Sequence, residues 1–305
     1  MTDSLTPPIR SSSEPPAILL PPADLFLQRA TRFEQLADGH SLGDWLRYLG
    51  ALSRAQHAAL QSLQSVPALP QPDVTALALA GEHRMPPLPA QSWPRPAAWQ
   101  TIPRQLAATL LPLAPPGARA DLERLAAQPA DRLETLADQV LRTELYGEHA
   151  GLLTYVAAAL QVLWTALAQQ LGAGLTALDV PGVCPCCGFL PVASIVKGAG
   201  EVSNLRYLHC ALCNTEWNLV RVKCAACDAN EGISYQQLDG PGIRQPQAVK
   251  AETCDSCKSY LKIIYSEYGG IDPVADDLAT LALDMLVDEA GYARAGPNLL
   301  YIPGS

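Results

Sequence analysis

Apolar residues recur at helical spacing through the first half of the chain. One example is a run in which every third or fourth position is apolar: Leu42, Trp45, Leu46, Leu49, Leu52, Leu60 and Leu63. This period predicts an amphipathic helix facing a core, and Ser41 with Asp44 three residues later is a capping-box variant at its start. Similar patterns predict helices over 23–36, 104–111, 119–127 and 131–147. We therefore expect an all-helical domain over residues 23–180.

Two segments of this half do not follow the helical pattern. Residues 1–22 are rich in Pro and Ser, which predicts a flexible N-terminal tail that is unstructured or loosely docked. Residues 66–103 contain nine prolines and leave room for one short helix near 74–80.

A long uncharged segment, residues 150–178, could be mistaken for a membrane span. Its apolar part, up to Leu171, is long enough to cross a bilayer. However, Gln161, Gln169 and Gln170 interrupt it, and no cluster of Lys or Arg flanks it. We interpret it as a central buried helix and expect no membrane insertion.

The pattern changes to strands after Pro181-Gly182. Strand-like segments in this part of the chain are 190–196, 205–209, 215–222, 233–238, 248–253 and 260–265, with turns at 197–200 and 240–242. A helical period returns over 274–289 and places Asp276, Asp277, Asp284 and Asp288 on its outer face. The predicted fold class is α+β and multidomain: a helical domain, two tandem β modules over 181–222 and 223–270, and a C-terminal helix and tail over 271–305.

All nine cysteines lie in these two modules, and eight of them form four Cys-x-x-Cys pairs: Cys184/Cys187, Cys210/Cys213, Cys224/Cys227 and Cys254/Cys257. Such a pair lets two thiolates bind one metal ion from a single tight loop, and two pairs complete a tetrahedral shell of four sulfurs. The first two pairs are 22 residues apart and the last two are 26 apart, each enough for a hairpin, whereas only 10 residues separate the second pair from the third. We therefore pair first with second and third with fourth, which gives two consecutive ribbon-type metal modules.

Other uses of these cysteines fit less well. A disulfide framework belongs to small secreted domains, and the N-terminus carries no secretory signal. A thioredoxin-like pair would open a helix, but these pairs are flanked by strand-like segments. We interpret Cys186, inside the first pair, as a bystander, with ligand exchange or a redox thiol as the alternatives. We interpret His209 as a packing residue, with replacement of a ligand as the alternative.

The chemistry that these residues allow is limited. Four protein sulfurs leave no open position on an ion, so hydrolytic metal catalysis is not expected, and the sequence holds no phosphate loop, dinucleotide fingerprint or nucleophile elbow. The net charge of −9 argues against nucleic acid, and residues 184–267 hold eight Lys/Arg against eight Asp/Glu. We expect a non-enzymatic cytoplasmic protein whose partner is another protein.

Several further segments resemble the formate dehydrogenase accessory protein family, FdhE. They are the runs 205–217 (LRYLHCALCNTEW), 220–224 (VRVKC), 250–255 (KAETCD), 260–263 (YLKI) and 274–279 (VADDLA), with 42–47 (LGDWLR) in the helical half. The resemblance spans most of the chain and is weakest over 66–130.

The resemblance implies more than the spacing does. Members of that family are cytoplasmic maturation factors that interact with the catalytic subunit of respiratory formate dehydrogenase before its export, and they carry rubredoxin-like sites that hold iron. By position, Cys184, Cys187, Cys210 and Cys213 would bind one iron ion, and Cys224, Cys227, Cys254 and Cys257 the other. Cys186 lies outside the family pattern.

Three questions stay open at this point. Tetrahedral sulfur sites suit zinc as well as iron. A rubredoxin-like redox protein that passes electrons during maturation of the client is the alternative function. The sequence does not indicate the oligomeric state or the client-binding surface.

Overall fold

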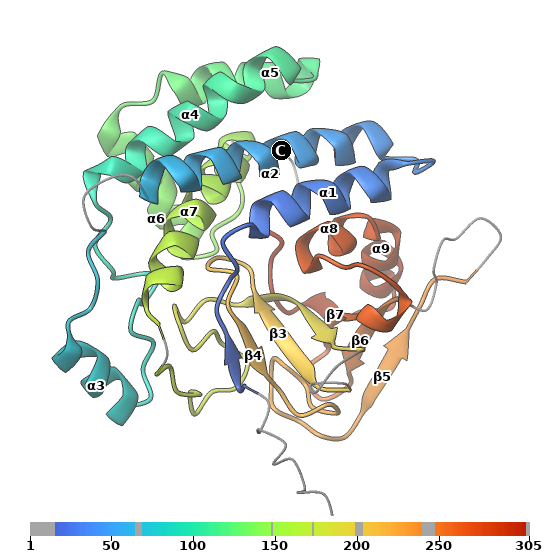
Figure 1. Ribbon diagram of the computed structural model, residues 1–305. Helices are drawn as coiled ribbons and strands as arrows, with labels where there is room; N and C mark the ends of the chain where they lie inside the picture. The colour runs from blue at the N-terminus through green and yellow to red at the C-terminus, as the bar shows by residue number, and fades with distance from the viewer. Residues whose placement is uncertain are drawn as a thin grey trace, which may run out of the picture.

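A computed structural model gives the fold, and it describes residues 16–64, 69–147, 149–172, 174–198, 204–239 and 248–302. The predicted turn at 240–242 and the second half of the predicted turn at 197–200 lie outside these residues, as does most of the N-terminal tail. Helices and a mixed sheet form two adjoining layers, with the helices of the first half on one side and the sheet on the other (Figure 1).

The helical layer follows the predicted pattern. Its α-helices are α1 (Leu25–Ala37), α2 (Gly43–Gln64), α3 (Val74–Glu82), α4 (Thr101–Leu110), α5 (Pro116–Ala126), α6 (Ala130–Leu141) and α7 (Ala150–Gln170), and short 3-10 turns cover Ala97–Gln100 and Leu111–Leu113. Helix α7 packs against α2, α4, α5 and α6, and its Gln161 and Thr165 form hydrogen bonds with Ala211 and Asn214, just after β3. Among the described residues it is the one helix long and apolar enough to cross a membrane, and 94% of its apolar window is buried inside the fold. This is the central buried helix that the sequence predicts.

The strands form one sheet rather than two separate ones. They are β1 (Ile18–Leu19), β2 (Pro191–Val196), β3 (Arg206–Cys210), β4 (Glu216–Asn218), β5 (Ile233–Gln236), β6 (Val249–Cys254), β7 (Ser259–Tyr265) and β8 (Ala293–Arg294). The order is β1-β4-β3-β2-β7-β6-β5, with β8 on β7. The two modules meet where β2 and β7 pair in parallel, with Ser194 opposite Ile263. The module boundary at residue 222 stays a prediction, since this sheet continues across both modules.

Two expectations for the chain ends are corrected. Residues 18 and 19 are not part of a free tail, because they pair with Trp217 and Glu216 of β4. The single helix expected over 274–289 is two helices, α8 (Pro273–Leu278) and α9 (Leu281–Glu289), joined near Thr280.

The predicted location of the acidic residues of α8 was also wrong. Asp276 and Asp277 are 3% and 0% exposed, not on the outer face. Asp276 pairs with Arg32 of α1, and Asp277 pairs with Lys262 of β7 and Arg294 of β8. Burial of a carboxylate is tolerated when opposite charges and hydrogen bonds replace water, and these partners lie far away in the sequence.

Candidate metal centres

The first centre lies at one end of the sheet, where the loop before β2 meets the end of β3. Cys184 and Cys187 come from the loop, Cys210 ends β3, and Cys213 follows in the next turn. The sulfurs of Cys184 and Cys213 are 3.4 Å apart, and those of Cys187 and Cys210 are 3.5 Å apart. All four sulfurs lie within 4.8 Å of one another, and all four residues are buried.

The second centre has the same design at the end of the other hairpin. Cys224 and Cys227 lie in the loop before β5, Cys254 ends β6, and Cys257 precedes β7. Sulfur–sulfur distances are 3.7 Å for both Cys224/Cys257 and Cys227/Cys254. Here Cys227 and Cys257 are exposed, whereas Cys224 and Cys254 are buried.

A repeated backbone turn shapes the four pairs. The residue after the second cysteine of each pair has a positive φ: Gly188 (73°), Asn214 (60°), Asp228 (66°) and Lys258 (53°). The turn brings amide groups to the sulfurs, so that Leu212 N and Cys213 N donate to the sulfur of Cys210 and Ala226 N to that of Cys224. Lys258, a residue with a long side chain, adopts the same left-handed conformation as the other three. A side chain there costs about 1–2 kcal/mol relative to glycine.

The sulfur positions fit a four-coordinate metal ion. At a metal–sulfur distance of about 2.3 Å, a regular tetrahedron has sulfurs ~3.8 Å apart, near the spacing of the second centre and slightly above that of the first. A disulfide would require about 2.05 Å, and all nine cysteines are unpaired. The donor set therefore fits two thiophilic ions, each with four protein sulfurs. It leaves no ligand position for water.

The electrostatics of the buried thiols also favour a bound cation. Burial raises the pKa of the Cys184 and Cys187 thiols well above their usual value. Burial alone would also raise the pKa of the Cys213 thiol. Hydrogen bonds from Cys184 and the other thiols outweigh burial, so the pKa of Cys213 is lowered. The neighbouring thiols thus stabilise one thiolate, that of Cys213. Four thiolates at this buried site would need a metal ion to balance their charge.

A buried polar network joins the first centre to the helical layer. Asn214, directly after Cys213, accepts from Arg29 of α1 at 2.8 Å and donates to Thr165 of α7 at 2.8 Å. Arg29 also donates through Nε to both carboxylate oxygens of Asp272, at 3.0 and 3.1 Å. Nothing in the sequence pattern singled out Arg29 or Asp272, because their partners are 185 and 243 residues away.

The two candidate alternative ligands lie outside both groups of four. His209 is buried beside the first centre, and its ring nitrogens contact Asn214 and Glu216 rather than an ion site. Cys186 is also buried, and its carbonyl accepts from Leu88 N at 3.0 Å. Its thiol contacts Cys213 and Thr215, which places a fifth sulfur next to the first centre.

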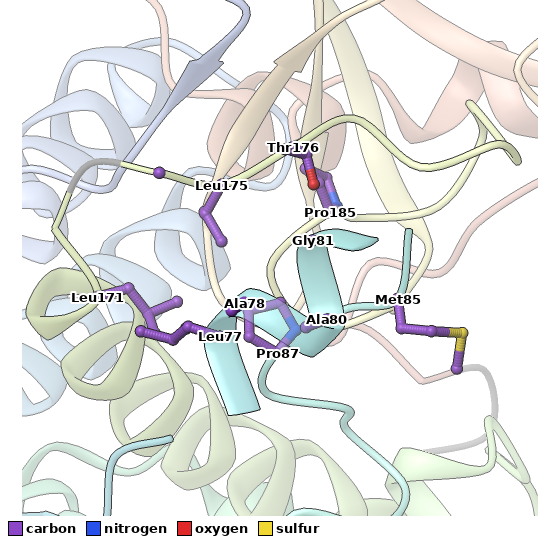
Figure 2. A pocket seen from close by; sticks show the side chains of 11 residues that line it. Leu77, Ala78, Ala80, Gly81, Met85, Pro87, Leu171, Leu175, Thr176 and Pro185 are labelled. Carbon is purple, nitrogen blue, oxygen red and sulfur yellow. The ribbon is translucent and has the colours of Figure 1, made fainter. Parts of the chain in front are cut away.

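Helix α3 forms an apolar surface next to the first centre. It is nine residues long and has no buried residue, and Val74 and Leu79 are 84% and 54% exposed. A pocket of about 200 Å³ lies between this helix and Pro185, which sits inside the first Cys pair. Figure 2 shows Leu77 and Ala80 of α3 on one side of the pocket and Pro185 on another.

Comparisons with known proteins agree with this architecture. Three family models match: "FdhE, N-terminal" over residues 14–177, "FdhE, central domain" over 183–221 and "FdhE, C-terminal domain" over 222–301.

Two curated relatives are named "Protein FdhE homolog". The one from Edwardsiella ictaluri is 40% identical over 92% of this chain and 89% of its own length. The one from Pseudomonas aeruginosa is 39% identical over 95% of this chain and 94% of its own length. A solved structure, "The crystal structure of the FdhE protein from Pseudomonas aeruginosa", matches with a TM-score of 0.82 and 37% identity, covering 95% of this chain and all of that one. The chain belongs to the FdhE family.

Proposed function

We propose that this protein is a non-enzymatic accessory factor that binds the catalytic subunit of respiratory formate dehydrogenase in the cytoplasm, before export. Membership in the FdhE family carries this proposal, because it supports an accessory role in formate dehydrogenase maturation. The closed shape of both cysteine groups agrees with it, since a metal ion with four protein ligands has no position for a substrate.

Exposed apolar surface supports protein binding as the mode of action. Helix α3 has no buried residue, and Met285 of α9 is 66% exposed. Both lie beside pockets lined largely by apolar residues, and concave apolar sites of this kind are typical of places that bind a partner.

The test is recovery of the client. A tagged protein in cells that express the respiratory enzyme is expected to capture the catalytic subunit, and deletion of the gene is expected to abolish formate dehydrogenase activity. Normal activity in the deletion strain, without capture of the subunit, would refute the proposal.

We propose iron as the ion in both centres, with zinc as the alternative. The eight ligands are Cys184, Cys187, Cys210 and Cys213 in the first centre, and Cys224, Cys227, Cys254 and Cys257 in the second. Thiolate sites bind zinc more tightly than ferrous iron, so overproduction in a foreign host favours zinc. Metal analysis of protein purified anaerobically from its own host distinguishes the two. A colourless zinc protein that complements the deletion strain would exclude iron.

Electron transfer is a second candidate function, and one observation favours it. Cys227 and Cys257 reach the surface, so a partner can approach the second ion closely. Such a protein should show a coloured ferric–thiolate state that is reduced and reoxidised reversibly. Complementation by a zinc-only protein would rule this function out.

A further inference from the structure

A second, larger cavity shares no lining residue with the pocket at α3 and lies between α9, the C-terminal segment and the loop after α6. Its volume is about 590 Å³, within the range that holds a bound peptide side chain or a small ligand. Apolar groups line most of it: Leu145, Leu190, Leu281, Met285, Pro297 and Tyr301. Met285 is 66% exposed and Tyr301 40%, so this apolar lining is open to solvent.

The walls of the cavity come from several elements. Tyr301 packs edge-on against Trp45 of α2, with ring centroids 6.0 Å apart. Leu281 and Met285 are four residues apart on α9 and face the cavity together. Met285 is the flexible member, and methionine is the residue that adapts best to an incoming apolar group.

Asp284 and Arg294, which line the cavity, already have ion-pair partners. Asp284 accepts from Lys262 at 2.6 Å and from Arg294 at 3.0 Å, and Arg294 also pairs with Asp277 at 2.8 Å. Two cations thus face two carboxylates. An anionic ligand would have to take Arg294 away from both of its carboxylates, so this site does not favour an anion.

The remaining charge at the cavity is negative. Asp288 lies one turn beyond Met285, is exposed and lines the cavity, and it makes no ion pair with any described residue. An occupant that carries a positive charge next to an apolar group complements this site. A second copy of the chain fits poorly, because its net charge of −9 opposes association through an acidic site.

We propose that this cavity, the α9 pocket, docks a segment of the immature catalytic subunit in which an apolar side chain lies beside a Lys or Arg. The apolar side chain inserts between Leu281, Met285 and Tyr301. The basic group pairs with Asp288. This inference rests on the proposed function and names the surface that performs it.

The α9 helix offers matched controls for the test. Met285 and Leu286 are both exposed apolar residues, but only Met285 lines the pocket; Asp288 and Glu289 are both exposed acids, but only Asp288 lines it. Four full-length variants follow: M285D and D288K at the pocket, and L286D and E289K as controls. Each is purified with its metal ions, and its melting temperature and metal content verify the fold.

Binding is measured by biolayer interferometry against the cofactor-free catalytic subunit of formate dehydrogenase from the same host. M285D and D288K are expected to raise the Kd by about tenfold or more, the effect of a central interface residue. L286D and E289K are expected to leave the Kd within about twofold, as residues outside such a centre do. Raised salt should weaken binding of the wild type more than binding of D288K.

The outcomes separate the two claims. If the wild type binds the subunit and all four variants bind equally well, or all four are equally weakened, the pocket assignment is wrong while the accessory function stands. If the wild type does not bind the subunit, the accessory function and the pocket both fail. If sedimentation shows a wild-type dimer that M285D separates into monomers, the occupant is a second copy and the proposal is overturned.

Discussion

The two cysteine centres share one backbone design but differ in what surrounds them. In the first centre all four cysteines are buried, and Asn214 connects it to α1 and α7. In the second, Cys227 and Cys257 are exposed, and the sulfur of Cys257 contacts the hydroxyl of Ser259 at 3.0 Å. The same local motif thus serves two environments.

This difference predicts different roles. The first centre is continuous with the main hydrophobic core, since Cys184, Cys187, Cys210 and Cys213 belong to the same cluster of buried residues as α7. Loss of its ion would leave buried thiols without a balancing charge inside the core. An ion in the second centre would be lost or exchanged with less damage, because solvent already reaches half of the ligands there. We interpret the first as structural and the second as accessible to partners.

The largest effect is expected from removing a ligand of each centre. C210S should prevent the protein from folding, because a structural site of four sulfurs contributes about 10 kcal/mol, as much as the whole stability of many domains. C257S should lose one ion and keep the fold. Soluble yield, circular dichroism and metal content per chain check this. Equal loss of fold in both variants would contradict the difference in roles.

The next effect concerns the link between the first centre and the helical layer. R29M leaves Asp272 buried without its partner and should lower the free energy of unfolding by about 3–5 kcal/mol. The matched change R47M breaks the exposed pair with Asp44 and should cost less than about 1 kcal/mol. Denaturant unfolding measures both. A small effect of R29M would show that the network does not hold the centre in place.

The sequence predicted the parts of this molecule that depend on local spacing. The four Cys-x-x-Cys pairs meet as the gap lengths indicated, and most helices and strands fall close to the predicted segments. Two predicted segments were too long: the helix expected over 131–147 ends at Leu141, and the strand expected over 215–222 ends at Asn218. Contacts between distant segments could not be predicted. The parallel pairing of β2 with β7 joins residues that are about 70 positions apart in the sequence. Asp276 and Asp277 of α8 can be buried because they form ion pairs with residues of α1, β7 and β8, namely Arg32, Lys262 and Arg294.

A third prediction tests how the two centres are joined. Gly182, just before the first centre, lies so close to Ala225 of the second that a Cβ at 182 would overlap the carbonyl oxygen of Ala225. G182A should lower the free energy of unfolding by about 1–3 kcal/mol, a typical cost of overpacking, and should speed metal loss from the second centre. G117A is the control, since a Cβ there meets nothing within 4 Å. Unchanged stability of G182A would mean that the centres are independent.

The smallest effect is a pH dependence beside the first centre. Burial opposes ionisation of Glu216, but the hydrogen bond with His209 and the charges of His209 and Lys197 outweigh it and lower its pKa to about 2. A carboxyl group with a depressed pKa stabilises the fold above its unfolded pKa, and this contribution is lost as pH falls towards its folded pKa. Between pH 5 and pH 4, the contribution of Glu216 to the free energy of unfolding should fall by about 0.5 kcal/mol.

E216Q should remove this contribution. The melting temperatures of the wild type and E216Q are measured at pH 5 and pH 4. The wild type should lose more stability than E216Q between these two pH values. If the two proteins lose the same stability between these values, Glu216 does not carry the charge that its surroundings favour.

Native mass spectrometry during treatment with a chelator tests the central claim most directly. The anaerobically purified protein should begin with two ions per chain, one for each group of four sulfurs, and should lose one of them well before the other. C257S should begin with one ion and show only the slow loss. Two ions that leave together, or a chain that carries fewer than two ions and disulfides between the cysteines, would contradict this account.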